Sequence, residues 1–77
     1  MQVVKRLNSY YAKPKAIRIA TITKGTTLKQ LAKDVSTHYQ TIVNVAGGKQ
    51  PTSELRAKAI ANQLDVKVED IFEVGKR

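Results

Sequence analysis

The sequence predicts an all-α fold, in which five short helices pack into one compact domain with a basic extension at its amino end. Apolar residues recur at helical spacing in several short stretches. Polar capping residues, glycines and prolines separate these stretches. A chain of 77 residues, 42% of them hydrophobic, can build one core and has no room for a second. We assign residues 15–77 to the helical domain and residues 1–14 to a basic arm or a short extra element.

Residues 1–13 fit more than one conformation. One helical face would collect the apolar residues Val3, Val4, Leu7, Tyr10 and Tyr11. Pro14 would end that helix. A strand and a flexible arm also remain open for so short a segment. The two tyrosines either pack on the domain, which we favour, or stack on bases.

Residues 16–24 permit two interpretations, of which we favour the helix. Four residues before Gly25 lie at helical spacing, namely Ile17, Ala20, Thr21 and Lys24. The alternation of β-branched residues over 17–19 and 21–23 is instead typical of a strand.

Two short helices joined by a turn are predicted in the middle of the chain. Thr27 and Gln30 fit a capping box, and Thr37 and Gln40 repeat the Thr-x-x-Gln pattern at the start of a second helix over 38–45. The apolar stripes are Leu28, Leu31, Ala32 and Val35 in the first helix, and Ile42 and Val45 in the second. Several β-branched residues weaken the second helix, but its capping signals and the glycine pair after it favour a helix.

Two further helices complete the domain. The first begins near Thr52–Ser53 and ends at Asp65, a residue type that tolerates the left-handed conformation. Its apolar face is Leu55, Ala59, Ile60 and Leu64, and the last helix follows with Val68, Ile71 and Phe72. Across the domain we expect six residues to be buried, namely Leu31, Ile42, Val45, Leu55, Ile60 and Phe72.

The charge of the chain indicates a polyanionic partner. Fourteen Lys and Arg against six Asp and Glu give a net charge of +8, and residues 1–25 carry six of the bases and no acid. Such a domain binds nucleic acid or an anionic membrane surface. No apolar run exceeds three residues and no signal peptide is visible, so we expect a cytoplasmic protein without membrane contact.

Composition also argues against an enzyme. The chain has no cysteine and a single histidine, so disulfides, thiolate chemistry and a zinc site of the usual kind are excluded. We find no acid–base pair, nucleophile or metal-ligand cluster. The expectation is a protein without cofactor or small-molecule ligand.

The second central helix has the composition of a helix that reads DNA. Its outward positions are Tyr39, Gln40, Thr41, Val43 and Asn44. Gln and Asn amides can form paired hydrogen bonds with adenine, and Thr and Val methyl groups can contact thymine methyls in the major groove. The alternative is that these residues are the solvated surface of an ordinary helical bundle.

At these residues the chain resembles the lambda-repressor-like helix-turn-helix family, also called Cro/cI or XRE. Residues 24–32 (KGTTLKQLA) resemble its opening motif, and residues 41–49 (TIVNVAGGK) its recognition helix and following loop. Residues 57–66 (AKAIANQLDV) and 68–72 (VEDIF) resemble the closing motifs, and the register holds without a gap across 16–72.

The resemblance implies five packed helices and a near-palindromic operator in double-stranded DNA, bound by a homodimer with half-sites about one helical turn apart. The loop that carries Lys49 would meet the phosphate backbone, or else be a plain helix cap with a solvated lysine. The basic amino-terminal residues would form an arm along the phosphates, or else a solvated tail. The expected phosphate contacts are Thr27, Lys29, His38, Gly48, Lys49, Lys5, Arg6, Lys13 and Lys15.

Two residues depart from the family pattern. Leu28 stands where the family usually has a Gln that contacts a phosphate and braces the recognition helix. Ser36 stands at the turn, where the family favours Gly, and a serine at positive φ costs about 1 kcal/mol.

Three functions follow from these observations. The first is a sequence-specific transcriptional regulator, such as a Cro-like repressor of a phage, plasmid or mobile element. The second is a protein-interaction module, such as an antitoxin or co-regulator with the same fold, which exposed apolar surface on the amino-terminal segment and weak DNA affinity would favour. The third is an architectural or RNA-binding protein, which would bind scrambled sequences equally well.

Overall fold

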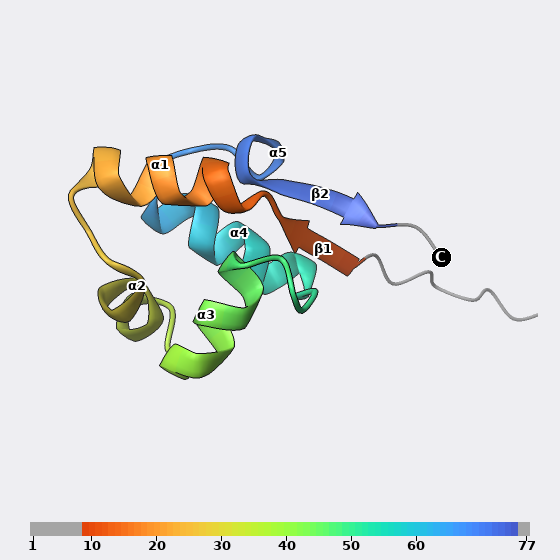
Figure 1. Ribbon diagram of the computed structural model, residues 1–77, viewed down its shortest axis with the longest axis horizontal. Coiled ribbons are helices and arrows are strands. Elements are labelled where there is room, and N and C mark those ends of the chain that lie inside the picture. The colour runs from red at the N-terminus through yellow and green to blue at the C-terminus, as the bar shows by residue number, and fades with distance from the viewer. Residues whose placement is uncertain (1–8, 76–77) are drawn as a thin grey trace, which may run out of the picture.

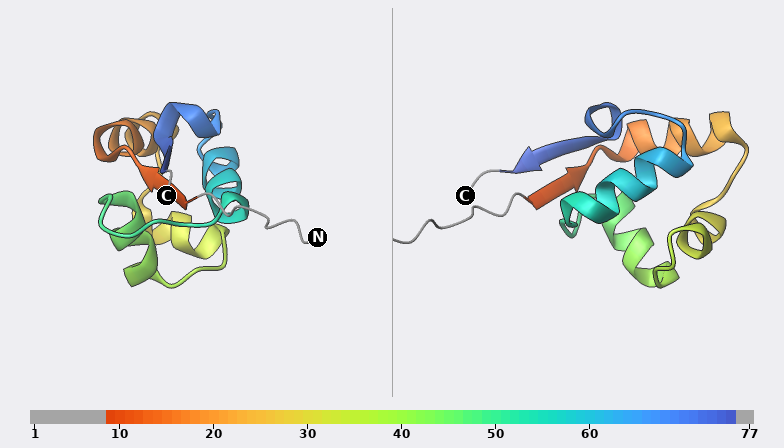
Figure 2. Two further views of the ribbon diagram at one scale, coloured as in Figure 1. Left: turned by 90° about the vertical axis from the view of Figure 1, so that its right-hand side faces the viewer. Right: turned by 180° about the vertical axis from the view of Figure 1, so that it is seen from behind.

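The structure, a computed structural model, describes residues 9–75, in which two short strands flank five helices along the chain. The elements are β1 (Ser9–Ala12), α1 (Pro14–Lys24), α2 (Leu28–Asp34), α3 (Tyr39–Ala46), α4 (Glu54–Gln63), α5 (Val68–Ile71) and β2 (Phe72–Gly75). Figure 1 shows α2 and α3 together on one side of α1 and α4, with the two strands projecting at one end. Viewed along the long axis, the helices surround a common centre (Figure 2).

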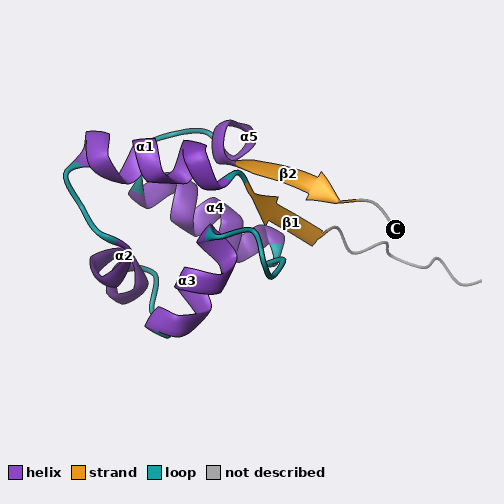
Figure 3. Ribbon diagram, viewed as in Figure 1, coloured by secondary structure: helices purple, strands orange, loops and turns teal. Residues whose placement is uncertain are grey.

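The expectation of an all-α fold is wrong, because β1 and β2 form a small antiparallel sheet (Figure 3). The register pairs Ser9 with Gly75, Tyr10 with Val74, Tyr11 with Glu73 and Ala12 with Phe72. Tyr, Phe and Val favour strands. The pairing of β1 with β2 joins the two ends of the described chain, however, and the residue pattern within either short segment does not predict a pairing between distant segments. Of the conformations left open for residues 1–13, residues 9–12 adopt the strand, and residues 1–8 lie outside the described part.

The sheet also changes the end of the last predicted helix. α5 ends at Ile71, and Phe72 begins β2 with its side chain buried. The ring of Tyr10 packs edge-on against the ring of Phe72, with centroids 6.5 Å apart and an interplanar angle of 79°. Backbone hydrogen bonds in both directions join Tyr10 to Thr52 before α4. The packing predicted for the tyrosines is therefore confirmed for Tyr10.

α1 confirms the helix predicted over residues 16–24, but it begins two residues earlier. Pro14 occupies its first position, where a helix needs no N–H donor, so the expectation that Pro14 ends a helix is wrong. The residues that α1 buries are Ile17, Ala20 and Thr21. Ile19 and Ile22, which contributed to the strand-like alternation, are exposed. At 11 residues α1 is the longest described helix, and no helix in residues 9–75 is long and apolar enough to cross a membrane.

The core confirms five of the six residues predicted to be buried, namely Leu31, Ile42, Val45, Ile60 and Phe72. The prediction for Leu55 is wrong, because 80% of its surface is exposed. The residues that α4 buries are Ala57, Ile60 and Ala61, and Leu64 directly after it is also buried. This stripe contains two alanines, which carry little apolar signal, and it lies on a different side of the helix from Leu55.

The capping predictions have mixed outcomes. Thr27 caps α2 as predicted, because its Oγ1 accepts a hydrogen bond from the backbone N–H of Gln30 at 3.1 Å. The Gln30 side chain does not return to the cap but donates to Oδ1 of Asp34 at 2.9 Å. The second capping box is wrong, because His38 is the N-cap residue of α3 and its side chain makes no capping bond. The hydroxyl of Thr37 instead donates to a carbonyl in the turn before it.

Candidate nucleic-acid interface

The turn between α2 and α3 sets the direction in which the chain enters α3. Ser36 has a φ of 54°, in the left-handed region expected for this position. The N–H of Thr37 donates to the carbonyl of Ala32 at 2.9 Å, and the N–H of Ser36 donates to the carbonyl of Lys33 at 3.1 Å. This pair of bonds is a Schellman motif, which satisfies the last carbonyls of α2. The turn is therefore well defined without a glycine.

The inward side of α3 is fixed to the core. Ile42 and Val45 are each 1% exposed, and Ala46 is also buried. These residues confirm the predicted orientation of the helix. Rotation of α3 would expose this apolar stripe, so its opposite side faces solvent in a fixed orientation.

The outward side of α3 carries the five residues predicted to read bases. Tyr39 is 51% exposed and Gln40 is exposed, whereas Thr41, Val43 and Asn44 are half-buried. Nε2 of Gln40 donates to Oδ1 of Asn44 at 3.4 Å, so the two amides lie side by side on one helix face. The side-chain oxygen and second N–H of Gln40, and both N–H donors and the second oxygen lone pair of Asn44, are left for another partner.

Three predicted phosphate contacts lie at the starts of the two helices. Thr27, Lys29 and His38 are all exposed. Thr27 uses its hydroxyl oxygen to cap α2, and its hydroxyl hydrogen can still be donated. Lys29 lies in the first turn of α2, and His38 directly precedes α3. All three therefore lie at or directly before the first turn of α2 or α3.

Two further predicted phosphate contacts lie after α3. Gly48 has a φ of 76°, and a Cβ atom there would lie 3.4 Å from the carbonyl oxygen of Ala12 and 3.5 Å from Cγ of Pro14. The loop that leaves α3 therefore packs against the connection between β1 and α1. This contact places the exposed Lys49 in the segment beside the start of α1, which carries the exposed Lys15.

The structure separates Lys13 from these residues. Nζ of Lys13 donates to the backbone carbonyl of Glu69 at 3.1 Å, so this side chain lies against α5. It also lines a pocket with Phe72 and Val74 of β2. Lys5 and Arg6 lie outside the described residues, so their predicted roles stay predictions.

Arg18 lies beside α3 and is absent from the contacts expected from the sequence. A pocket of about 250 Å³ opens between α1, α2 and α3, and Arg18 lines it together with Leu28, Val43 and Gly47. The sequence offers one signal, because Arg18 directly follows the buried Ile17 and so lies at the edge of the buried face. Which helix lies across that edge depends on the tertiary fold.

The cations around α3 have no acidic partner among the described residues. Within the described range 9–75 there is one ion pair, which joins Nζ of Lys58 to Oε2 of Glu54 on α4 at 3.1 Å. Lys15, Arg18 and Lys49 are thus free to bind an external anion. Their charge is complementary to a phosphate backbone.

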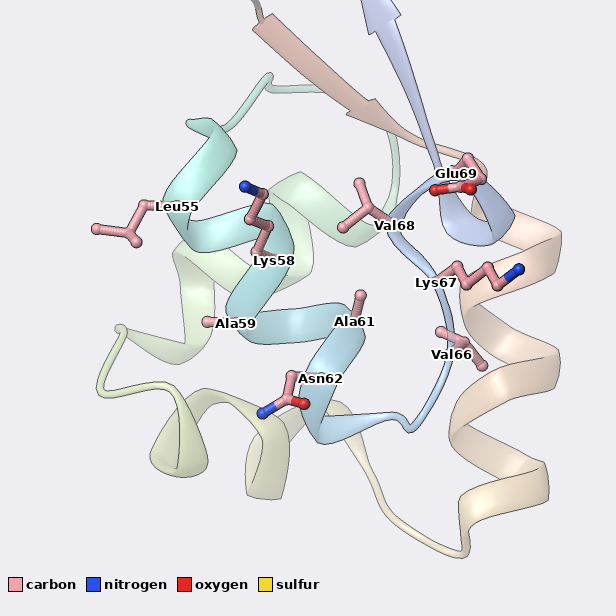
Figure 4. Close-up of a pocket in the computed structure, with 9 residues that line it drawn as sticks. All are labelled: Leu55, Lys58, Ala59, Ala61, Asn62, Val66, Lys67, Val68 and Glu69. Atoms are coloured by element: carbon pink, nitrogen blue, oxygen red, sulfur yellow. The ribbon is translucent and has the colours of Figure 1, made fainter.

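A second, partly apolar surface lies between α4 and the segment before α5, away from α2 and α3. A pocket of about 660 Å³ lies between α4 and residues 66–69. Figure 4 shows Leu55 among its lining residues, pointing away from the helix. Its lining includes Ala59, Val66 and Val68. No residue of α2 or α3 lines it. The pocket is therefore separate from the outward side of α3.

Comparison of the chain with protein-family models, with curated proteins and with solved structures finds no match.

Proposed function

We propose that this protein is a sequence-specific DNA-binding transcriptional regulator that places α3 in the major groove of an operator. The observation that carries the proposal is the pairing of Gln40 with Asn44 on the outer side of a helix whose inner side is buried. A polar helix face held in a fixed orientation by core packing is what direct reading of base edges requires. The free cations on both flanks of α3 support the same function.

In this proposal the bases are read from the centre of α3. Gln40 and Asn44 bind adenine edges, because each amide offers both a donor and an acceptor. Thr41 and Val43 contact thymine methyls on either side of these amides. Tyr39 contacts a base or a methyl group at the start of the helix.

The phosphate contacts fix the position of α3 on the duplex. Thr27, Lys29 and His38 bind one stretch of backbone. Lys15, Lys49 and the backbone of Gly48 bind the backbone at the other end of α3. Lys5 and Arg6 extend these contacts as an arm, and Lys13 joins them only if its amine leaves the carbonyl of Glu69.

The proposal extends to the family and the setting. We infer a member of the lambda-repressor-like helix-turn-helix family, acting as a Cro-like repressor of a phage, plasmid or mobile element. It would act on the bacterial nucleoid as a homodimer on a near-palindromic operator, without cofactor or small-molecule ligand. The departure at Leu28 bears on one phosphate contact and leaves the base-reading residues unaffected.

The test is selection of bound duplexes from a random DNA pool. We expect one enriched sequence in two inverted half-sites, with an affinity at least about 1000-fold above that for a scrambled duplex at the same salt concentration. Equal affinity for selected and scrambled duplexes would instead indicate an architectural or RNA-binding protein.

A second function is favoured by the outer side of α1. Ile19 and Ile22 are 64% and 70% exposed, and exposed apolar residues on one helix are typical of protein-binding surfaces. A protein-interaction module would use this side, whereas the regulator would use α3. Ile22→Ser should leave DNA affinity unchanged in the regulator and abolish partner binding in the interaction module.

A further inference from the structure

Arg18 is a basic residue whose position in the fold is not accounted for by the roles described so far. It lies on the side of α1 that faces α3 and lines the pocket between these helices with Val43 and Gly47. Val43 belongs to the outward side of α3, and Gly47 follows the last residue of that helix. Arg18 therefore lies beside the flank of the base-reading face.

The side chain of Arg18 is available for an external ligand. It is exposed, and it forms neither an ion pair nor a side-chain hydrogen bond with any residue from 9 to 75. Arg56 and Lys58 differ, since Arg56 donates to the hydroxyl of Thr52 and Lys58 pairs with Glu54. Gly47 carries no side chain that would close the pocket from the α3 side.

We propose that Arg18 binds a backbone phosphate of the operator and so positions α3 from the α1 side. This inference rests on the proposed DNA-binding function and adds a residue to it. The phosphate backbones run along both edges of the major groove, so a cation on the flank of a helix in that groove meets a phosphate before it meets a base. A guanidinium can bind two phosphate oxygens at once, which fixes orientation as well as distance.

The position of Leu28 in the same pocket strengthens the inference. Leu28 is half-buried and lines the pocket with an aliphatic side chain, which cannot bind an anion. Arg18 is the charged residue among those that line it. Among the residues that line this pocket, Arg18 is therefore the one whose charge can bind a phosphate.

The experiment compares Arg18→Ala with Lys24→Ala in the full chain. Lys24 is a matched control because it lies on the same helix and lines a different pocket, together with Ile19 and Asp70. Its substitution by alanine removes the same charge as Arg18→Ala. Each variant is titrated with the selected duplex and a scrambled duplex over a range of salt concentrations. Thermal unfolding checks that each variant is folded.

We expect Arg18→Ala to weaken binding to both duplexes by about tenfold and to lower the slope of log affinity against log salt by about 1. Lys24→Ala should bind nearly as the unchanged protein does. Arg18→Lys should keep the salt slope and recover part of the affinity, because it keeps the charge and loses the two-point contact.

Three results would overturn the inference, and they are distinguishable from failure of the proposed function. If Arg18→Ala and Lys24→Ala have the same affinity and slope, Arg18 does not bind phosphate. If Arg18→Ala weakens only the selected duplex, Arg18 reads a base. If the unsubstituted protein binds no DNA, the proposed function and this inference both fail. If it selects a DNA sequence but either of the first two results is found, the proposed function stands and only the phosphate contact of Arg18 is wrong.

Discussion

Single residues with positive φ end the four longer helices of this fold. Gly25 ends α1, Ser36 ends α2, Gly48 ends α3 and Asp65 ends α4, with φ values of 79°, 54°, 76° and 60°. At each end the N–H of this residue and the N–H of the residue after it donate to carbonyls in the last turn of the helix. Asp65 confirms the end predicted for α4. Glycine adopts this conformation without steric cost, whereas Ser36 and Asp65 are strained.

The first prediction concerns that strain at Ser36. Ser36→Gly removes the contact between Cβ and the backbone, and Ser36→Ala keeps it, so the two variants isolate the conformational cost. We expect the glycine variant to have a free energy of unfolding about 1 kcal/mol higher than the alanine variant. Urea denaturation measures the difference. Equal stability of the two variants would show that the turn does not hold this residue at positive φ in solution.

The second prediction separates residues that read bases from those that bind phosphate. Gln40→Ala should weaken binding to the selected operator by about 1–3 kcal/mol and leave scrambled DNA almost unaffected. Asn44→Ala should behave in the same way. Lys49→Ala, the matched phosphate variant, should weaken both duplexes nearly equally. Titrations at one salt concentration decide, and unchanged discrimination in both amide variants would remove α3 from the role of reader.

At the scale of elements, the sequence predicts what local rules control. The caps at Thr27 and Ser53 and the helical stripes predict α2 to α4 within a few residues, because capping and periodicity act within one segment. The sheet depends on contacts between distant segments, so residues 9–12 could not be distinguished from a helix or an arm. Leu55 was wrongly predicted to be buried because its large apolar side chain gives a stronger hydrophobic signal than the two alanines that α4 buries. The candidate site followed the same rule, since α3 was predictable and the neighbouring Arg18 was not.

The third prediction tests how far the terminal elements stabilise the core. Phe72 is 3% exposed and contacts Tyr10 across the sheet, so Phe72→Ala should cost about 3–5 kcal/mol in the free energy of unfolding. Leu55→Ala is the control, because truncation of an exposed side chain should change stability by less than about 0.5 kcal/mol. Thermal or urea unfolding measures both. An unchanged melting temperature for Phe72→Ala would mean that β2 is not part of the stable fold.

At the scale of the whole molecule, exposed cations and exposed apolar residues lie next to one another on α1, and α4 adds a further exposed apolar residue. Lys15, Arg18 and Ile22 lie one turn apart on one face of α1, Lys49 follows α3, and the exposed Leu55 lies on α4. The whole chain has a net charge of +8, and this total includes the basic amino-terminal residues. Association with DNA should therefore release counterions and depend steeply on salt.

The fourth prediction measures the share of the amino-terminal arm in this effect. Replacing Lys5 and Arg6 together by Gln should reduce the slope of log affinity against log salt by about 2 if both contact phosphates. Substitution is preferable to deletion of residues 1–13, since deletion would also remove β1 and its pairing with β2. A slope equal to that of the unchanged protein would assign these two residues to a solvated tail.

The most direct test of the central claim, that α3 and its flanks contact DNA, is amide chemical-shift mapping with the selected duplex. We predict the largest shifts in residues 38–49, with further shifts around Lys15, Arg18 and Lys29. The scrambled duplex should shift the flanking residues and leave Gln40 and Asn44 much less affected. Shifts centred on Ile19 and Ile22 or on the pocket beside Leu55, with none in α3, would contradict the account.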